Sequence, residues 1–198
     1  MLIDIVVFDG VDELDVLGPF EVLRRAQRAR SSLIVRLVSV TGQQSIRAAA
    51  GLTFESDAPF RPGDAEILVV PGGGWASRAR KGAWAEAERG ELPSMLAAST
   101  NVRVKAAVCT GTMLWATAGL ITGRRATTHR SSLQELAALG VEVVDERVVD
   151  DGDLVTSGGV TSGIDMALWL VERELDADVA TAIATELEYG RYRPNVGS

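Results

Sequence analysis

Short, continuous apolar segments alternate with longer segments of mixed polarity along most of this chain. The apolar segments are rich in Val, Ile and Leu, and they stop at Gly, Pro or Asp. Runs of this kind are typical of strands that are buried on both faces, as in a parallel sheet. We expect strands at 2–8, 33–40, 67–70, 102–108, 141–149 and 154–156, with one or two short strands between 45 and 54.

The segments between the strands place their apolar residues on one side of a helix. They predict helices at 14–30, 112–118, 131–139, 159–175 and 177–189, with an interrupted helical region over 75–98. This alternation predicts an α/β protein, a flavodoxin-like three-layer α/β/α sandwich with a mostly parallel, doubly wound sheet. No repeat or linker divides the sequence, so we expect one domain over 1–192 and a loose tail at 193–198.

The composition limits the classes of partner. Lys and Arg total 20 against 27 Asp and Glu, for a net charge of −7, which argues against nucleic acid because phosphate contacts need clustered cations. No apolar stretch reaches the length of a membrane span, and the N-terminal run carries Asp4 without a preceding basic segment. We therefore expect a cytoplasmic protein that binds neither membrane nor nucleic acid and acts on a small molecule.

The single cysteine, Cys109, is the first candidate for chemistry. With one cysteine and one histidine in the chain, neither a disulfide nor an ordinary metal site is expected. Cys109 directly follows a predicted strand and precedes a helix, and Gly111 permits a tight turn between them. A helix N-terminus favours a thiolate there, and A-V-C-T-G matches half of a nucleophile elbow. The alternative is a small core residue, as for most free cysteines.

A thiolate nucleophile needs a group that moves protons. Asp15, soon after the first strand, is the best candidate, and Asp12 and Glu13 are the alternatives. Asp15 fits equally well as an ordinary helix cap before Pro19. The only histidine, His129, reaches the site only if its loop folds back, and otherwise it is a structural loop residue.

A glycine-rich turn ends another predicted strand at the same edge of the sheet. Gly72, Gly73 and Gly74 follow the strand at 67–70, and ligands of such sheets bind beyond the carboxyl ends of the strands. Their backbone N–H groups suit an oxyanion hole, while a loop that only turns the chain is equally plausible. The turn at 157–161 presents the same two alternatives for an anion.

Together these segments resemble the ThiJ/PfpI superfamily, which has the class I glutamine amidotransferase-like fold. The motifs that carry the resemblance are E-L-D-V-L-G-P-F-E-V-L (13–23), V-P-G-G-G (70–74), A-V-C-T-G (107–111), A-G-L-I-T-G-R-R-A-T-T-H (118–129) and V-T-S-G-G-V-T-S-G-I-D (155–165). They span essentially the whole chain. Within the superfamily, the pattern is similar to isocyanide hydratases and to the amidase-like domains of AraC-type regulators.

The resemblance implies an activity and a role for several residues. It implies a hydratase in which Cys109 attacks an isocyanide, Asp15 acts as acid and base, and Thr110 follows the nucleophile, with an N-substituted formamide as product and no cofactor. Proteases and deglycases of the superfamily carry Glu where this chain has Asp15, which speaks against those activities. Because superfamily members are commonly homodimers, the resemblance also implies a homodimer.

Three residues depart from the hydratase pattern near the expected pocket. Gly74, the third glycine of the turn, and Trp75 after it differ from the hydratase loop, and Arg130 follows the A-T-T-H motif that ends in His129. We take Trp75, His129 and Arg130 as candidate pocket residues. The departures leave two alternatives open: a non-catalytic domain that binds a small molecule or registers oxidation of Cys109, and another cysteine-dependent amidase-like hydrolase.

Overall fold

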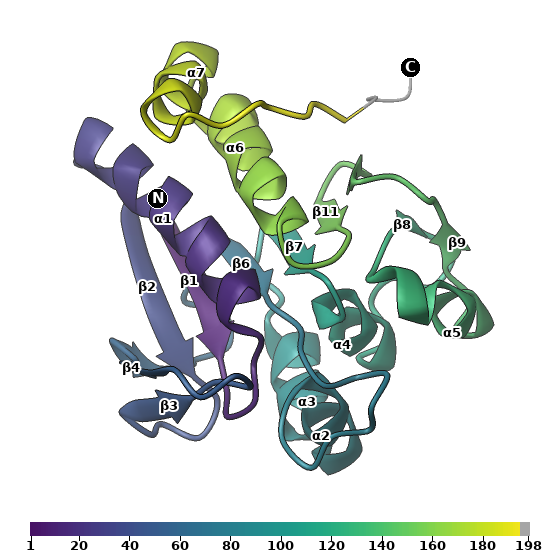
Figure 1. The fold of residues 1–198 in the computed structure, drawn as a ribbon. Coiled ribbons are helices and arrows are strands. Elements are labelled where there is room, and N and C mark those ends of the chain that lie inside the picture. The colour runs from purple at the N-terminus through teal and green to yellow at the C-terminus, as the bar shows by residue number, and fades with distance from the viewer. Residues whose placement is uncertain (195–198) are drawn as a thin grey trace.

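The computed structural model describes residues 1–194, and a seven-stranded sheet forms its centre (Figure 1). The strand order is β10-β11-β7-β6-β1-β2-β5, and every neighbouring pair is parallel except β10 with β11. The strands are β1 (Leu2–Val7), β2 (Ile34–Ser39), β5 (Ala58–Pro59), β6 (Ile67–Val70), β7 (Val104–Val108), β10 (Val148–Asp150) and β11 (Leu154–Ser157). The predicted α/β class with a mostly parallel sheet is confirmed.

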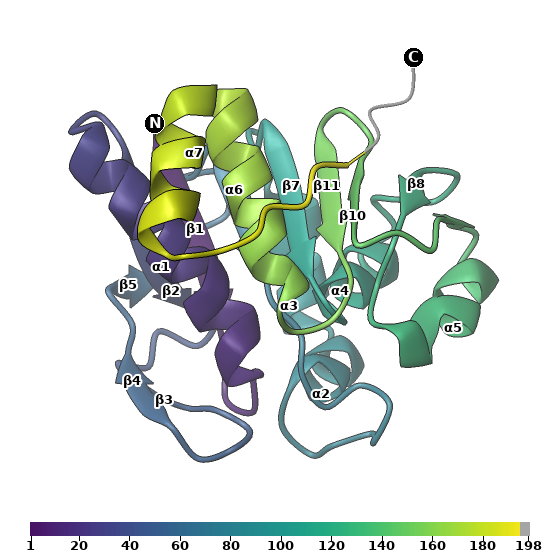
Figure 2. The same ribbon diagram turned by 45° about the horizontal axis from the view of Figure 1, so that its top comes forward.

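Helices cover both faces of the sheet, as Figure 2 shows, with one group in front of the strands and the other behind. The front group is α1 (Glu13–Ala29), α6 (Ser162–Glu174) and α7 (Ala177–Glu186), and the rear group is α2 (Ala83–Arg89), α3 (Glu91–Ala98) and α4 (Gly111–Thr117). All residues of β6 are buried, because side chains on both faces pack under helices. Within residues 1–194, no helix is long and apolar enough to cross a bilayer.

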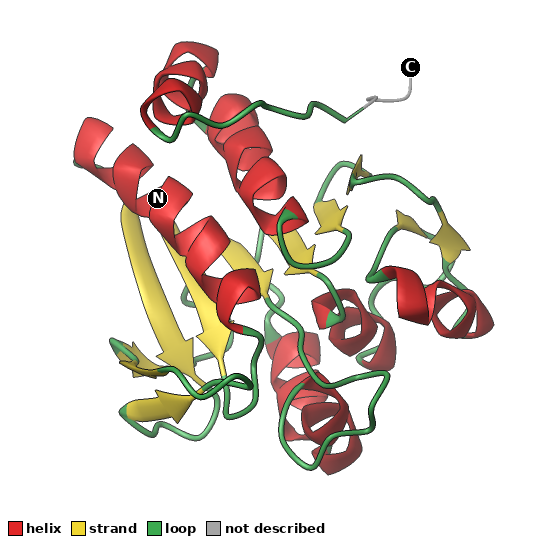
Figure 3. Cartoon of the chain, viewed as in Figure 1, coloured by secondary structure: helices red, strands yellow, loops and turns green. Residues whose placement is uncertain are grey.

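Several elements differ from the sequence prediction, and Figure 3 shows them at the periphery of the sheet. The single strand predicted over 141–149 is two, β9 (Glu142–Val143) and β10, because the polar run Asp145–Arg147 interrupts the apolar pattern. β9 pairs with β8 (Arg125–Ala126), which the sequence analysis missed, beside α5 (Leu133–Ala138) and a 3-10 turn at Arg130–Ser132.

Two further segments were predicted incompletely. The strands expected between 45 and 54 form a separate hairpin of β3 (Ser45–Arg47) and β4 (Thr53–Glu55). The region 75–82 is a loop, so the helical part of the predicted 75–98 segment begins at α2. Of the predicted tail, residues 195–198 lie outside the described residues, while Arg193 is ion-paired with Glu172 at 3.0 Å.

Close packing between α1 and α6 sets the position of the first turn of α1. Gly163 lets α6 approach Pro19, since a Cβ there would lie 3.2 Å from the proline ring. Pro19 is the seventh residue of α1 and lies inside the helix rather than near its start. Asp12 is the N-cap of α1 and accepts the Leu14 N–H at 3.1 Å. Asp15 is therefore not the cap residue, and its carboxyl is free for another role.

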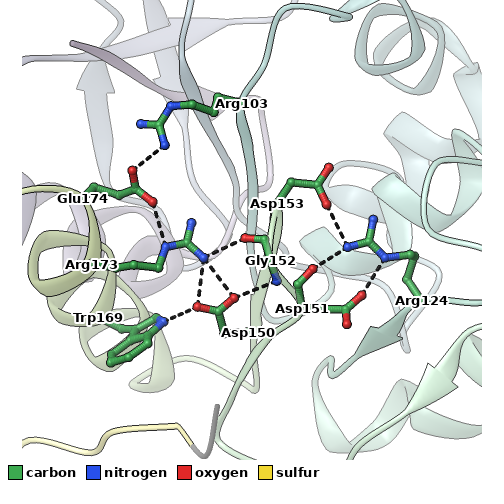
Figure 4. A network of polar contacts seen from close by, with 9 residues as sticks. All are labelled: Arg103, Arg124, Asp150, Asp151, Gly152, Asp153, Trp169, Arg173 and Glu174. Atoms are coloured by element: carbon green, nitrogen blue, oxygen red, sulfur yellow. Dashed lines mark hydrogen bonds and ion pairs between the residues drawn. The ribbon is translucent and has the colours of Figure 1, made fainter. Parts of the chain in front are cut away.

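A network of ion pairs surrounds the buried side chain of Asp150 at the end of β10 (Figure 4). The Asp150 side chain, 4% exposed, accepts hydrogen bonds from the Trp169 indole at 2.7 Å and from Arg173 Nη1 at 2.8 Å. Arg173 also pairs with Glu174, which in turn binds Arg103. Asp150 thus satisfies two donors of α6 at the end of β10.

We expect Asp150→Ala to destabilise the protein by about 3 kcal/mol, because it leaves a partly buried guanidinium and an indole N–H without their acceptor. The matched control is Asp153→Ala, whose carboxylate is 46% exposed and pairs with Lys105 and Arg124 near solvent, so its loss should cost less than about 1 kcal/mol. Urea unfolding of both variants measures the difference. Equal losses of unfolding free energy in the two variants would show that burial of the carboxylate does not decide how much it stabilises the protein.

Candidate active site

Cys109 lies at a sharp elbow between β7 and α4. Its φ is 56°, a left-handed conformation that non-glycine residues rarely adopt and that recurs at functional sites. Its N–H donates to the carbonyls of Ser157 at 3.1 Å and Gly158 at 3.0 Å, and Thr128 Oγ1 donates to its carbonyl at 2.8 Å. These three bonds hold the strained residue in place.

Close backbone approach at the elbow explains its glycine. A Cβ on Gly111 would lie 1.9 Å from the Val70 carbonyl oxygen, so only glycine lets α4 begin against the end of β6. A Cβ on Gly72 would lie 2.4 Å from Thr110 Oγ1. The two loops predicted from sequence to share one edge of the sheet are therefore in direct contact.

Asp15 is fully buried next to the cysteine. Its Oδ2 accepts the Gly72 N–H at 3.1 Å. Burial, and then the charge of Asp12, raise the pKa of Asp15 to about 7, although contact with Cys109 and with the N–H groups of Gly72 and Val160 lowers it in part. Asp15 Oδ1 is buried and has no hydrogen-bond partner within residues 1–194.

The position of Cys109 at a helix N-terminus predicted a thiolate, but its surroundings in the fold act in the opposite direction. Burial and the neighbouring Asp15 charge raise the pKa of the Cys109 thiol far above its usual value. The N–H groups of Thr110 and Val160 act in the opposite direction but are weaker than these two effects. The raised pKa favours the neutral thiol, so a base has to take its proton as the sulfur attacks. Asp15 is the group placed to accept it.

Most N–H groups of the glycine turn make hydrogen bonds within the protein and are not free to bind a ligand in the pocket. The Gly72 N–H binds Asp15, and the Gly73 N–H donates to Thr110 Oγ1 at 3.0 Å, so neither is directed at a substrate. Gly74 N–H makes no hydrogen bond within the described part of the chain. The N–H groups that act on the sulfur are instead those of Thr110 and Val160, which lower the pKa of the Cys109 thiol in part.

A pocket of about 240 Å³ opens onto the sulfur. It brings together most of the predicted residues with several that the sequence analysis did not single out for the pocket. Its lining residues are Asp12, Gly73, Gly74, Trp75, Ala76, Ser77, Cys109, Thr110, His129, Ser131 and Val160. Gly72 and Asp15 lie outside this lining. Arg130 borders a separate polar pocket with Thr128 and Arg147.

Comparisons with known proteins place the chain in a family with this fold. A model of the DJ-1/PfpI family matches residues 1–173. The chain belongs to the DJ-1/PfpI family. An isonitrile hydratase of Pseudomonas putida is 35% identical over 193 residues, which cover 97% of this chain and 80% of that protein.

Two solved structures share the fold of this chain. A ThiJ/PfpI family protein from Pseudomonas syringae superposes with a TM-score of 0.84 at 28% identity, covering 100% of this chain and 78% of that one. An AraC family transcriptional regulator from Pseudomonas putida superposes with a TM-score of 0.77 at 16% identity, covering 94% of this chain and 98% of that one, which shows the fold alone.

His129 forms one wall of this DJ-1/PfpI pocket, because its loop does fold back to the cysteine. A Cβ on Gly159 would lie 2.4 Å from His129 Cδ2, so the ring packs directly on the bare backbone of Gly159. The ring Nδ1 lies 2.7 Å from Ser131 Oγ. Within residues 1–194, no three Asp, Glu, His or Cys side chains are grouped to hold a metal ion.

The sequence analysis reached Val160 of this DJ-1/PfpI site only as part of the turn at 157–161 and did not single it out for the pocket. Its φ is 49°, which is strained for a β-branched residue, and its N–H reaches both Cys109 and Asp15. Arg147 donates to Thr161 Oγ1 at 3.0 Å and also pairs with Asp165, which holds the turn. Hydrophobic patterning carries no signal for a backbone N–H, so only the turn motif at 157–161 pointed to this region.

Proposed function

We propose that this protein is an isocyanide hydratase, which adds water to an isocyanide to give an N-substituted formamide. The observation that carries the proposal is the pairing of Cys109 with Asp15, whose pKa is raised to about 7 beside a neutral thiol. The 35% identity with an isonitrile hydratase supports it independently. The proposal includes a small-molecule substrate, a homodimeric assembly, a cytoplasmic location and no cofactor.

The reaction requires one proton to move from sulfur to carbon. The Asp15 carboxylate takes the Cys109 proton as the sulfur bonds to the terminal carbon of the isocyanide. Asp15 then gives that proton to the same carbon, which leaves a thioimidate, R–N=CH–S–Cys. A carboxyl with a pKa of about 7 suits both transfers, because it accepts and returns a proton at neutral pH.

Water completes the cycle. Asp15 removes a proton from a water molecule as the water oxygen bonds to the thioimidate carbon, and it passes that proton to the nitrogen, which gives R–NH–CH(OH)–S–Cys. Asp15 then takes the hydroxyl proton as the C=O bond forms and the C–S bond breaks, and it returns this proton to the sulfur as the formamide leaves. The atoms balance as one isocyanide plus one water giving one formamide.

Other functions of the site are less well supported. Redox-sensing cysteines are usually accessible and have a low pKa, whereas Cys109 is 7% exposed and has a raised one. A different cysteine-dependent hydrolase would use the same pair on a carbonyl carbon. That reaction needs donors for an oxyanion, and of the three glycine N–H groups those of Gly72 and Gly73 are engaged within the protein, which leaves Gly74.

Incubating the purified protein with a simple alkyl isocyanide should produce the N-alkyl formamide, detected by its formyl proton in NMR. Protein whose only cysteine has been alkylated is the control and should be inactive, because sulfur is the nucleophile. Absence of formamide from the untreated protein, or equal formation by the alkylated protein, would refute the proposal.

A further inference from the structure

A four-residue cluster holds the loop that covers the cysteine pocket. The Trp75 indole N–H donates to Glu135 Oε2 at 2.9 Å, and Arg78 donates to both oxygens of the same carboxylate at 3.1 and 3.2 Å. The Arg78 guanidinium also stacks on Trp84 of α2, 3.8 Å from the ring centre. One carboxylate on α5 thus fixes two residues of the loop, and we call these four residues the Glu135 cluster.

Trp75 is the largest side chain that lines the pocket. It is 3% exposed and packs edge-to-face on Trp84, with ring centres 5.2 Å apart and planes at 87°. The Trp75 side chain is therefore held by two tertiary contacts, a hydrogen bond to Glu135 and an aromatic contact with Trp84. An indole held by a hydrogen bond and by an edge-to-face contact has little freedom to swing away from the pocket.

The Glu135 cluster also joins the two sides of the pocket. Trp75 belongs to the loop after β6, whereas His129 and Ser131 belong to the segment that leads into α5. Glu135 lies on α5, one helical turn after Ser131, so its bond to Trp75 crosses from one side of the pocket to the other. The Glu135 carboxylate is thereby a direct link between the two sides of the pocket.

We propose that Trp75 determines substrate size and that Glu135 is the positioning residue that holds it, so that the pocket admits compact electrophiles and excludes bulky ones. The pocket, at about 240 Å³, is smaller than the roughly 300–1,000 Å³ of sites for drug-sized ligands. The compact electrophile is a small isocyanide, and this part rests on the proposed function. The size limit on access to the thiol does not rest on it.

Alkylation of the thiol tests the size limit without any assumption about catalysis. N-ethylmaleimide and N-(1-pyrenyl)maleimide carry the same reactive group on substituents of different size, and Cys109 is the only cysteine they can modify. Mass spectrometry gives both rates. In the natural protein the pyrenyl reagent should be much the slower, and Trp75→Ala should raise the pyrenyl-to-ethyl rate ratio about tenfold or more.

Variants of the Glu135 cluster distinguish the role of Trp75 from that of the residues that hold it in place. Glu135→Leu and Arg78→Met should raise the ratio by less than Trp75→Ala, because the indole is loosened and not removed. Trp75→Phe keeps most of the packing volume but loses the N–H bond, so it tests the role of Glu135 if Trp75→Ala does not fold. The matched control is Arg30→Met, because the Arg30–Asp176 pair is 50% and 37% exposed, close to 46% and 35% for Arg78–Glu135.

Each outcome decides the proposal. The proposal is supported if the rate ratio rises in Trp75→Ala, Trp75→Phe, Glu135→Leu and Arg78→Met but not in Arg30→Met. If this result is found and no isocyanide is hydrated, only the proposed function fails. A ratio unchanged by the Trp75 variants would overturn the size limit, and one unchanged by Glu135→Leu would overturn the positioning role. A ratio raised equally by Arg30→Met would overturn both.

Discussion

Asp15→Asn is expected to lower kcat for isocyanide hydration by about 10³-fold while making the folded protein more stable above pH 7. The loss follows because a neutral amide cannot take the proton of a thiol whose pKa is raised by burial. The gain follows because Asp15 is fully buried and carries an energetically costly charge, whereas asparagine can still accept the Gly72 N–H. Assays and urea unfolding across pH measure both.

The direction of the pH dependence follows from the raised pKa of Asp15. In the active protein, kcat/KM should rise as pH increases through about 7, since the carboxylate form is the base. Stability should fall over the interval from the unfolded-chain pKa of about 4 up to about 7, because the folded state holds the proton more tightly. Above that interval, the free energy of unfolding of Asp15→Asn should exceed that of the natural protein by on the order of 4 kcal/mol.

Asp12→Asn is the matched control for this carboxylate. Its charge raises the pKa of Asp15, and asparagine keeps the N-cap of α1, so the variant should fold and shift the rise in kcat/KM to lower pH. Cys109→Ala gives the background rate without a nucleophile. If Asp15→Asn keeps more than about a tenth of the activity, or keeps the same pH profile, Asp15 is not the base.

Gly111→Ala is expected to destabilise the protein by about 3 kcal/mol or more, and to prevent folding if the natural protein has little stability to spare. The added methyl would lie 1.9 Å from the Val70 carbonyl oxygen, and both atoms belong to backbone that the sheet and α4 hold in place. Relief requires the end of β6 and the start of α4 to separate. Urea unfolding, or the soluble yield if unfolding cannot be measured, reports the loss.

Gly119→Ala distinguishes this close approach from a backbone effect. Gly119 has a φ of 74°, and a Cβ added there would meet no heavy atom within 4 Å, so alanine should cost only about 1 kcal/mol, from conformation alone. A loss in Gly111→Ala no larger than in Gly119→Ala would mean that the elbow relaxes without difficulty. The account of the elbow as a fixed platform for Cys109 would then be wrong.

The strands of the sheet were largely predictable because the central ones are buried on both faces. Such strands have continuous runs of apolar residues. One central strand of the sheet lies in each of the predicted ranges 2–8, 33–40, 67–70 and 102–108. Short edge pairings have no such pattern. β5 and β8 are two residues long, and their existence depends on which neighbour the folded chain brings alongside.

The sequence by itself determined the α/β architecture and the convergence of Cys109, Asp15 and the glycine turn at one edge of the sheet, because parallel strands place their carboxyl ends together. Only the tertiary structure decided that the resting thiol is neutral, that the Gly72 N–H serves Asp15, that Arg130 borders another pocket and that Glu135 supports Trp75. Proton affinity and hydrogen-bond partners depend on burial and on neighbours distant in sequence, which local patterns do not encode.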